Sequence, residues 1–158
     1  MAQWSDLIEL LEASGDASLL TTHAQTPPEG VLTGLQTKID AHFDGERLQD
    51  ILNSLKGSET DFATAALKLI NRGSPLAMAC CIEILHRLRT PSLTIQKALE
   101  HEFRFTSRAM EHGDFLEGIR AQIIDKDRTP RWRHPDQNVP IVEVSRMLQP
   151  MGAKALTF

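Results

Sequence analysis

The chain has 158 residues, 41% hydrophobic and 24% charged, so it is long enough to bury one core and has an ordinary soluble, globular composition. Its formal net charge of −4 argues against broad electrostatic attraction to a nucleic-acid backbone. No apolar run approaches the roughly 20 residues that cross a bilayer, and the acidic N-terminus resembles no secretory signal.

The N-terminal residues predict two helices followed by a hinge. The first helix ends near Gly15, and one of its faces carries an apolar stripe of Trp4, Leu7, Ile8 and Leu11. A second, short helix is predicted over residues 16–23. Pro27 and Pro28 then deny the chain helical donors and fix φ. We therefore predict an N-terminal helical segment with a Pro-rich hinge over residues 1–30 and a helical domain over 31–158.

The predicted domain over 31–158 alternates apolar stripes of helical period with residues that end helices. Ser74-Pro75 is the clearest helix start, because Pro at the first turn loses no hydrogen bond. Further helices are predicted over residues 32–43, 44–56, 58–72, 94–111 and 140–148. No segment alternates with the period of a β-strand, so the sequence predicts an all-α, multi-helix fold.

The cysteine and histidine pattern indicates free thiols and no metal site. Cys80 and Cys81 are neighbours in a predicted helix, where adjacent side chains point about 100° apart and a disulfide between them is sterically poor. We therefore expect reduced thiols and a reducing, cytoplasmic setting. The six histidines form no His-x-x-x-His pair and no zinc-like spacing with the cysteines, so we predict neither a metal nor a cofactor.

Two predicted helices between Ser58 and Arg89, joined by a glycine turn, raise the alternative of a helix-turn-helix DNA reader. The second helix opens with Ser-Pro-Leu-Ala-Met-Ala-Cys-Cys. It offers no Arg, Lys, Asn or Gln that reaches base edges. DNA recognition is therefore disfavoured.

Residues 112–132 carry the most specific local pattern. Gly113 is predicted to end one helix in a left-handed conformation. Asp114 and Glu117 have the spacing of a capping pair at the start of the next. The apolar face of that helix consists of Phe115, Ile119 and Ile123. Trp132 is predicted either to pack over a neighbouring helix or to anchor another subunit.

Basic residues gather after this helix within an otherwise acidic protein; they are Arg120, Lys126, Arg128, Arg131, Arg133 and His134. One interpretation is an anion-binding site. The other is solvated charge at the C-terminal end of a helix, where the dipole favours cations. Asp125 and Asp127 flank Lys126 and weaken the local positive field.

The pattern Asp-Phe-x-Glu-Gly-x-Arg-Ala over 114–121, then Ile-Asp-Lys-Asp-x-x-Pro-x-Trp over 124–132, resembles the enoyl-CoA hydratase/isomerase (crotonase) superfamily, especially its 3-hydroxyisobutyryl-CoA hydrolase branch. Ser74-Pro75 and Glu102-Phe103-Arg104 fit the branch in the same order. The resemblance implies the C-terminal helical region of such an enzyme, without the α/β catalytic core. By the same resemblance, the full-length enzyme hydrolyses a branched 3-hydroxyacyl-CoA in valine breakdown.

The resemblance also implies a role for this portion. It packs on the catalytic core, covers the acyl-CoA pocket and mediates subunit contacts, so its partners are that core, a second copy of the chain, or both. Phe115, Lys126 and Arg128 are expected near CoA or substrate, and Asp114 and Glu117 are expected to be structural. No catalytic residue is assigned, because an oxyanion hole needs Gly-rich loops and this chain has no Gly-Gly pair.

Two alternatives stay open on the sequence. The chain can be a non-catalytic, standalone helical interaction module. It can also be the same region of an enoyl-CoA hydratase/isomerase. In each case we expect the chain alone to be inactive.

Overall fold

The computed structural model describes residues 2–158, and their side chains from Trp4 onward. The chain forms two compact units that divide between Gln36 and Thr37. Within the described residues every regular element is a helix or helical turn, and no strand is present. No helix in this part of the chain is long and apolar enough to cross a membrane.

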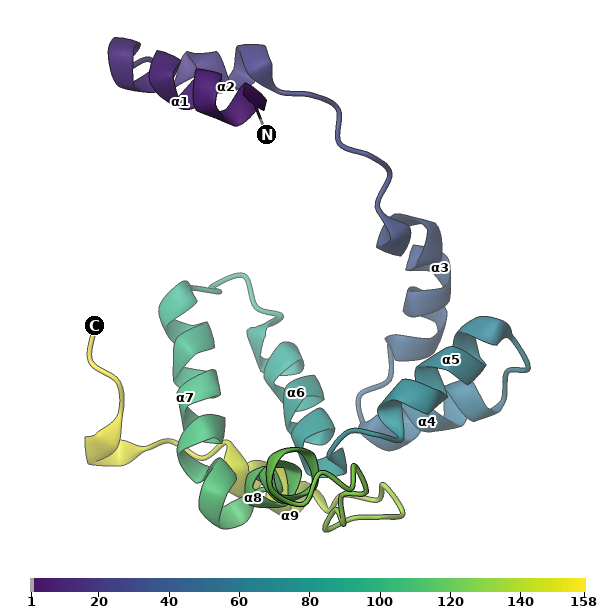
Figure 1. Cartoon of the computed structure of the whole chain (residues 1–158). Helices are drawn as coiled ribbons and strands as arrows, with labels where there is room; N and C mark the ends of the chain where they lie inside the picture. Colours follow the sequence, from purple (N-terminus) through teal and green to yellow (C-terminus); the bar gives the residue numbers. More distant parts are fainter. Residues whose placement is uncertain (1) are drawn as a thin grey trace. The chain divides into compact units, whose positions relative to one another are not determined.

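The first unit contains a helical hairpin of α1 (Ala2–Ser14) and α2 (Ser18–His23), which lie side by side (Figure 1). Gly15 makes the turn with a φ of 66°, a left-handed conformation that favours glycine. Its N–H donates to the Leu11 carbonyl over 2.8 Å. Trp4 is 69% exposed and Ile8 is also exposed, whereas Leu7 and Leu11 are half-buried, so only part of the apolar stripe of α1 faces solvent within this unit.

Residues 24–30, which contain Pro27 and Pro28, have no regular structure and lead to α3 (Val31–Phe43). The end of α3 contacts the next two helices, α4 (Leu48–Lys56) and α5 (Asp61–Ile70). His42 Nδ1 lies 2.9 Å from Ser54 Oγ, and the rings of His42 and Phe62 stack. A small core holds α4 and α5 together through Ile51, Leu55 and Ala63.

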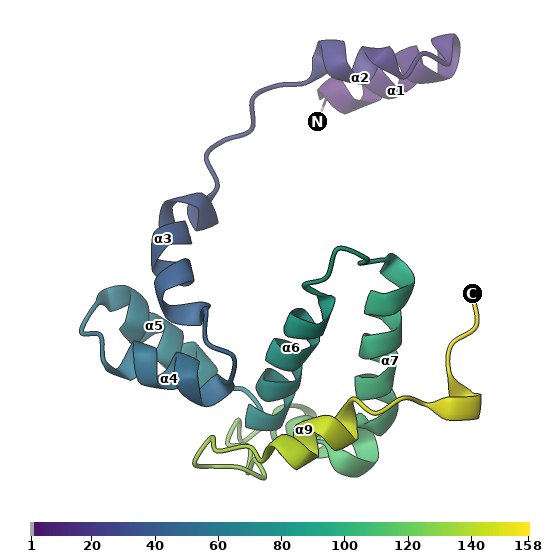
Figure 2. The same cartoon turned by 180° about the vertical axis from the view of Figure 1, so that it is seen from behind.

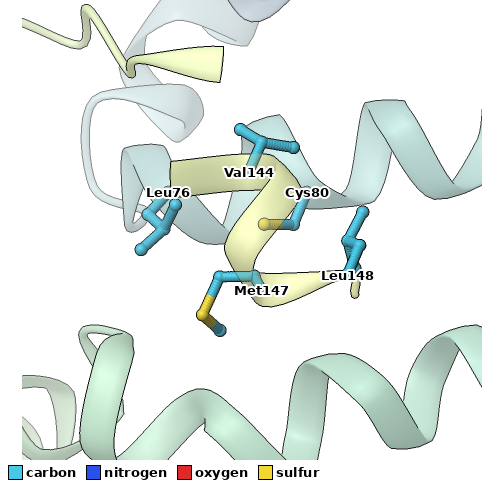
Figure 3. Packing of buried hydrophobic residues seen from close by; sticks show 5 residues of the cluster. All are labelled: Leu76, Cys80, Val144, Met147 and Leu148. Atoms are coloured by element: carbon cyan, nitrogen blue, oxygen red, sulfur yellow. The ribbon is translucent and has the colours of Figure 1, made fainter. Parts of the chain in front are cut away.

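The larger core forms where α9 (Ile141–Met147) crosses the hairpin of α6 (Pro75–Leu88) and α7 (Ile95–His112), at the end opposite the loop that joins them (Figures 1 and 2). Figure 3 shows its buried side chains, Leu76, Cys80, Val144, Met147 and Leu148. Phe105 of α7 packs against this cluster. Burial raises the pKa of the Cys80 thiol to about 12, whereas its neighbour Cys81 is exposed, and both thiols are free.

Side chains close the ends of these helices. Ser74 begins α6 as predicted, because its Oγ accepts the Ala77 N–H over 3.1 Å and Pro75 follows. At the C-terminal end of α9, Arg108 donates to the Met147 carbonyl over 3.2 Å, and Arg87 donates to the Leu148 carbonyl over 3.3 Å. These bonds satisfy carbonyls that have no partner within the helix and tie α9 to α6 and α7.

After α7 the chain forms α8 (Phe115–Ile119), a π-helical turn over Arg120–Ile124, and an irregular segment that returns to α9. A final 3₁₀ turn covers Gly152–Lys154. The site residues predicted from the sequence lie here: Asp114 immediately precedes α8, Phe115 and Glu117 lie in α8, and Lys126 and Arg128 lie in the irregular segment.

Candidate functional site

Gly113 ends α7, but not in the left-handed conformation that we predicted. Its φ of −103° and ψ of −170° are extended. The need for glycine is steric, since a Cβ there would lie 2.7 Å from the Ala109 carbonyl oxygen. The sequence located the helix end correctly, but the physical reason is close approach rather than a left-handed turn.

The predicted capping pair of Asp114 and Glu117 does not form. Asp114 occupies the N-cap position of α8, yet its side chain accepts no cap hydrogen bond, and its ψ of 11° differs from the extended geometry that caps require. The carboxylate is instead 7% exposed and accepts from Ser74 Oγ over 2.6 Å and from the Arg133 N–H over 3.2 Å. Asp114 thus joins the start of α6 to the segment after the π-helical turn.

Glu117 also holds the segment that follows the π-helical turn, at Arg131. Its two oxygens accept from Nε and Nη2 of Arg120 over 2.9 and 2.8 Å, and Oε1 also accepts the Arg131 N–H over 2.6 Å. The hydrogen bonds from Arg120, and next the one from Arg131, lower the pKa of Glu117 to about 2. Its carboxylate is therefore ionised throughout the physiological pH range.

Arg120 is the centre of a charge network. Its Nη1 donates to Asp125 Oδ2 over 2.6 Å and to Asp127 Oδ2 over 2.7 Å, and its Nη2 also donates to the Thr129 carbonyl over 3.1 Å. Three carboxylates thus share one guanidinium. Bonds from Arg120, followed by one from the Thr129 N–H, lower the pKa of Asp127 to about 2. The pKa of Arg120 itself is raised, first by Glu117.

The predicted ligand residues Lys126 and Arg128 lie between these anchored positions. Both are exposed and have positive φ values of 57° and 55°, which non-glycine residues rarely adopt. Among the residues that the structure describes, neither side chain has a hydrogen-bond or ion-pair partner. Within residues 125–128, therefore, the acidic side chains turn to Arg120 while the basic ones face solvent.

The structure divides the predicted basic cluster into two groups. Arg120 is held by carboxylates, Arg133 donates to the His112 carbonyl over 2.6 Å, and His134 lies 3.2 Å from Glu143. These three are engaged within the fold. Lys126, Arg128 and Arg131 form the other group: all three are exposed, and none of their side chains makes a hydrogen bond or ion pair with the described residues, so their charge is available to a ligand.

Phe115 borders an apolar groove of about 340 Å³ on the surface of the second unit. Its ring is 53% exposed, and Ile123 on the same face is also exposed. The groove's other lining residues include Leu76, Phe105, Ala109 and Trp132. Trp132 lies over α8, where a Cβ on Gly118 would be 3.7 Å from the indole. The site thus places an apolar groove beside α8 and exposed cations, Lys126, Arg128 and Arg131, on the segment that follows it.

Metal binding has no geometric support in the described part of the chain, where no three His, Cys, Asp or Glu side chains are grouped to hold an ion.

The sequence alone did not identify Ser74 as the partner of Asp114, or Arg120 as the partner of Glu117. The short spacing of Arg120 from Glu117, Asp125 and Asp127 along the chain was the signal that could have identified Arg120 as their partner.

Comparisons with known proteins relate this chain to a family. The enoyl-CoA hydratase/isomerase family model matches residues 2–148. The mitochondrial 3-hydroxyisobutyryl-CoA hydrolase of Rattus norvegicus is 33% identical over 122 residues, covering 77% of this chain and 31% of the relative. The Gallus gallus protein of that name is 36% identical over 135 residues, covering 81% and 34%. The chain thus spans about a third of these relatives, as the 31% and 34% coverage show.

Solved structures are similar over nearly the whole chain. The crystal structure of an enoyl-CoA hydratase from Rhodobacter sphaeroides 2.4.1 is 50% identical, with a TM-score of 0.87 over 99% of this chain and 45% of that one. A carnitinyl-CoA dehydratase from Mycobacterium thermoresistibile is 27% identical, with a TM-score of 0.85 and the same coverage.

These similarities correct the predicted fold class. We expected an all-α region distinct from the catalytic fold, but 99% of the chain matches crotonase-type structures at TM-scores of 0.85 and 0.87. The chain is therefore a crotonase-type domain and not a distinct C-terminal region. The prediction was wrong because helical periodicity and caps report local structure, whereas fold class depends on the larger arrangement to which the helices belong.

Proposed function

Because this chain belongs to the enoyl-CoA hydratase/isomerase family, whose model matches residues 2–148, we propose that it takes part in processing an acyl-CoA thioester. The family match is the observation that carries the proposal. Hydrolysis of a 3-hydroxyisobutyryl-CoA-like ester, as in valine breakdown, is the first candidate, since the relatives at 33% and 36% identity are named as that hydrolase. We assign this activity to the chain together with the part of the relatives' fold that it does not span, and not to the chain alone.

The local chemistry of the site supports a CoA ester as the ligand. Lys126 and Arg128 are exposed cations without partners among the described residues, and CoA carries phosphates that such cations bind. The apolar groove beside Phe115 fits an uncharged part of the same ligand. We assign Lys126 and Arg128 to the phosphates and Phe115 to the apolar portion, and no cofactor beyond the CoA of the substrate.

Enoyl-CoA hydration is the second candidate. It is favoured by the 50% identity with the Rhodobacter sphaeroides enoyl-CoA hydratase. Hydrolysis releases free CoA, whereas hydration removes the conjugated double bond and leaves the thioester intact. A thiol assay with 3-hydroxyisobutyryl-CoA and an absorbance assay with crotonyl-CoA therefore separate the two reactions.

The exposed apolar side chains support a macromolecular partner. Trp4 and Ile8 in the first unit, and Phe115 and Ile123 in the second, are all at least half exposed, at 69%, 50%, 53% and 65%. Clusters of this kind are uncommon on monomeric proteins unless they have a function. We assign as partners the part of the crotonase-type fold that this chain does not span, a second copy of the chain, or both.

A chimeric enzyme tests the proposal. This chain replaces the matching 45% of the Rhodobacter sphaeroides enoyl-CoA hydratase, where the two are 50% identical. We expect the chimera to turn over an acyl-CoA thioester, and the isolated chain to release no CoA from 3-hydroxyisobutyryl-CoA and to hydrate no crotonyl-CoA. A chimera that folds but neither binds nor converts acyl-CoA would contradict the proposal.

A further inference from the structure

We propose that Arg120 is a positioning residue that shapes residues 125–131 so that Lys126 and Arg128 face a phosphate while Asp125 and Asp127 are held away from it. The ligand-binding part of this inference rests on the proposed function, since the phosphate is that of a CoA ester. The role assigned to Arg120 comes from its own contacts.

The first argument is electrostatic. Asp125 and Asp127 immediately flank Lys126, so their free carboxylates would repel a phosphate that approached the lysine. Arg120 Nη1 holds both of them, at 2.6 and 2.7 Å. The guanidinium offsets part of this negative charge and holds both carboxylates on the Arg120 side of the turn, away from Lys126 and Arg128. Lys126 and Arg128 then present positive charge without an adjacent unpaired carboxylate.

The second argument is conformational. Left-handed φ values at Lys126 and Arg128 are unfavourable and persist only where the surroundings impose them. Arg120 binds Asp125, Asp127 and the Thr129 carbonyl, which are every second residue along this stretch. The intervening residues are therefore forced outward.

Two backbone hydrogen bonds complete the shape of the segment. The Arg128 N–H donates to the Ala121 carbonyl over 3.0 Å. The Arg131 N–H donates to Glu117, which Arg120 orients through two further bonds. Both amides therefore report on whether Arg120 holds the segment.

Lysine is not an adequate replacement at position 120. The guanidinium uses Nε, Nη1 and Nη2 together to reach three carboxylates and a carbonyl. An ammonium is a single point donor and lacks this fixed fork of N–H groups. Arg120→Lys keeps the charge and loses the geometry, whereas Arg120→Gln loses both.

The first test needs no ligand. Amide hydrogen exchange is followed by NMR at Arg128 and Arg131 in the full chain and in Arg120→Lys, Arg120→Gln and the control Arg104→Gln, which removes the ion pair with Glu100. We expect both amides to lose protection in the Arg120 variants and to keep it in the control, with the Cys80 amide unchanged in all. Unchanged protection in Arg120→Gln would overturn the inference, whatever the chain binds.

The second test measures CoA binding by calorimetry at low ionic strength. We expect Arg120→Gln to weaken binding about tenfold, and Lys126→Ala to add little in that background, because Arg120 acts through Lys126. Changing both Asp125 and Asp127 to Asn should restore part of the affinity of Arg120→Gln. A merely structural role would not produce this rescue, so its absence would refute the electrostatic argument.

The outcomes separate the inference from the proposed function. If the unmodified chain binds CoA and Arg120→Gln binds it equally well, the positioning role fails while the proposed function stands. If the unmodified chain binds CoA no better than a variant with Lys126 and Arg128 both changed to Ala, the phosphate site assigned to these residues is wrong. The role of Arg120 in turning them toward a phosphate is then wrong as well. The exchange experiment still decides the conformational role.

Discussion

Replacing Asp114 by Ala should lower the free energy of unfolding of the second unit by about 2–4 kcal/mol. The carboxylate is only 7% exposed and accepts from Ser74 Oγ at 2.6 Å and from the Arg133 N–H at 3.2 Å. Its removal leaves two donors in a largely buried setting, and each such donor costs about 1–3 kcal/mol. Two such donors sum to about 2–6 kcal/mol. We expect the lower part of that range because Arg133 is itself exposed, so that water can bind its freed N–H. Even the lower part exceeds most of the usual cost of a lost helix cap, about 0.5–2 kcal/mol.

Urea unfolding followed by circular dichroism measures this change. Glu59→Ala is the matched control, since Glu59 is an exposed carboxylate and surface changes stay within about 0.5 kcal/mol. Asp114→Asn keeps one acceptor oxygen, so its loss of unfolding free energy should lie between those of Asp114→Ala and Glu59→Ala. In a double-mutant cycle with Ser74→Ala, Asp114→Ala should show a coupling of about 0.5–3 kcal/mol. An effect of Asp114→Ala equal to that of Glu59→Ala would refute the reasoning.

Three further predictions concern the charged loop and the first unit. Lys126→Ala should change the unfolding free energy by no more than about 0.5 kcal/mol, but in the assembled enzyme it should raise the KM for acyl-CoA, most strongly at low salt. The pKa values of Glu117 and Asp127, both lowered to about 2 from 4.5 and 3.8, mean that their stabilisation is present above about pH 4.5 and is lost as the pH falls toward 2. An acid titration should show this loss, and Arg120→Gln should largely abolish it; an identical acid profile in that variant would contradict the assignment. Sedimentation at micromolar concentration should show self-association that Trp4→Asp weakens, and a monomer at all concentrations would count against it.

Local structure followed from the sequence where neighbours along the chain determine it. Ser74-Pro75 starts α6 because the serine oxygen reaches an amide only three residues away, at 3.1 Å. Pro27 and Pro28 lie in residues 24–30, which have no regular structure, for an equally local reason: proline fixes φ and lacks an N–H. In both places the interacting groups lie within one turn, so spacing alone was informative.

The predictions failed where the partner is distant in sequence. Asp114 and Glu117 have the spacing of a capping pair, but the donors that Asp114 accepts from lie 40 residues before it and 19 after it. These long-range donors can be recognised only once α6 and the returning segment have been placed. The fold class failed for a related reason, because the residues of each helix do not specify the larger fold to which the helices contribute.

The basic cluster was predicted in part, because the sequence showed its charges but not their partners. The sequence displayed its charges and left two interpretations open, an anion site and solvated cations. It could not show that Arg120 uses its guanidinium on Glu117, Asp125 and Asp127 and leaves Lys126 without a partner among the described residues. The alternation of acidic and basic residues after Arg120 was the available signal, and it was not used.

The adjacent thiols of α6 give the larger core its own chemical reporter. Cys81 is exposed, while Cys80 lies in the core with a pKa raised to about 12, so at neutral pH it is both inaccessible and protonated. Thiolate is the form that alkylating reagents attack. A brief pulse of iodoacetamide should therefore modify one cysteine in folded molecules and two in molecules whose α6–α9 contact has opened. Mass spectrometry then counts the open fraction directly, without any engineered label.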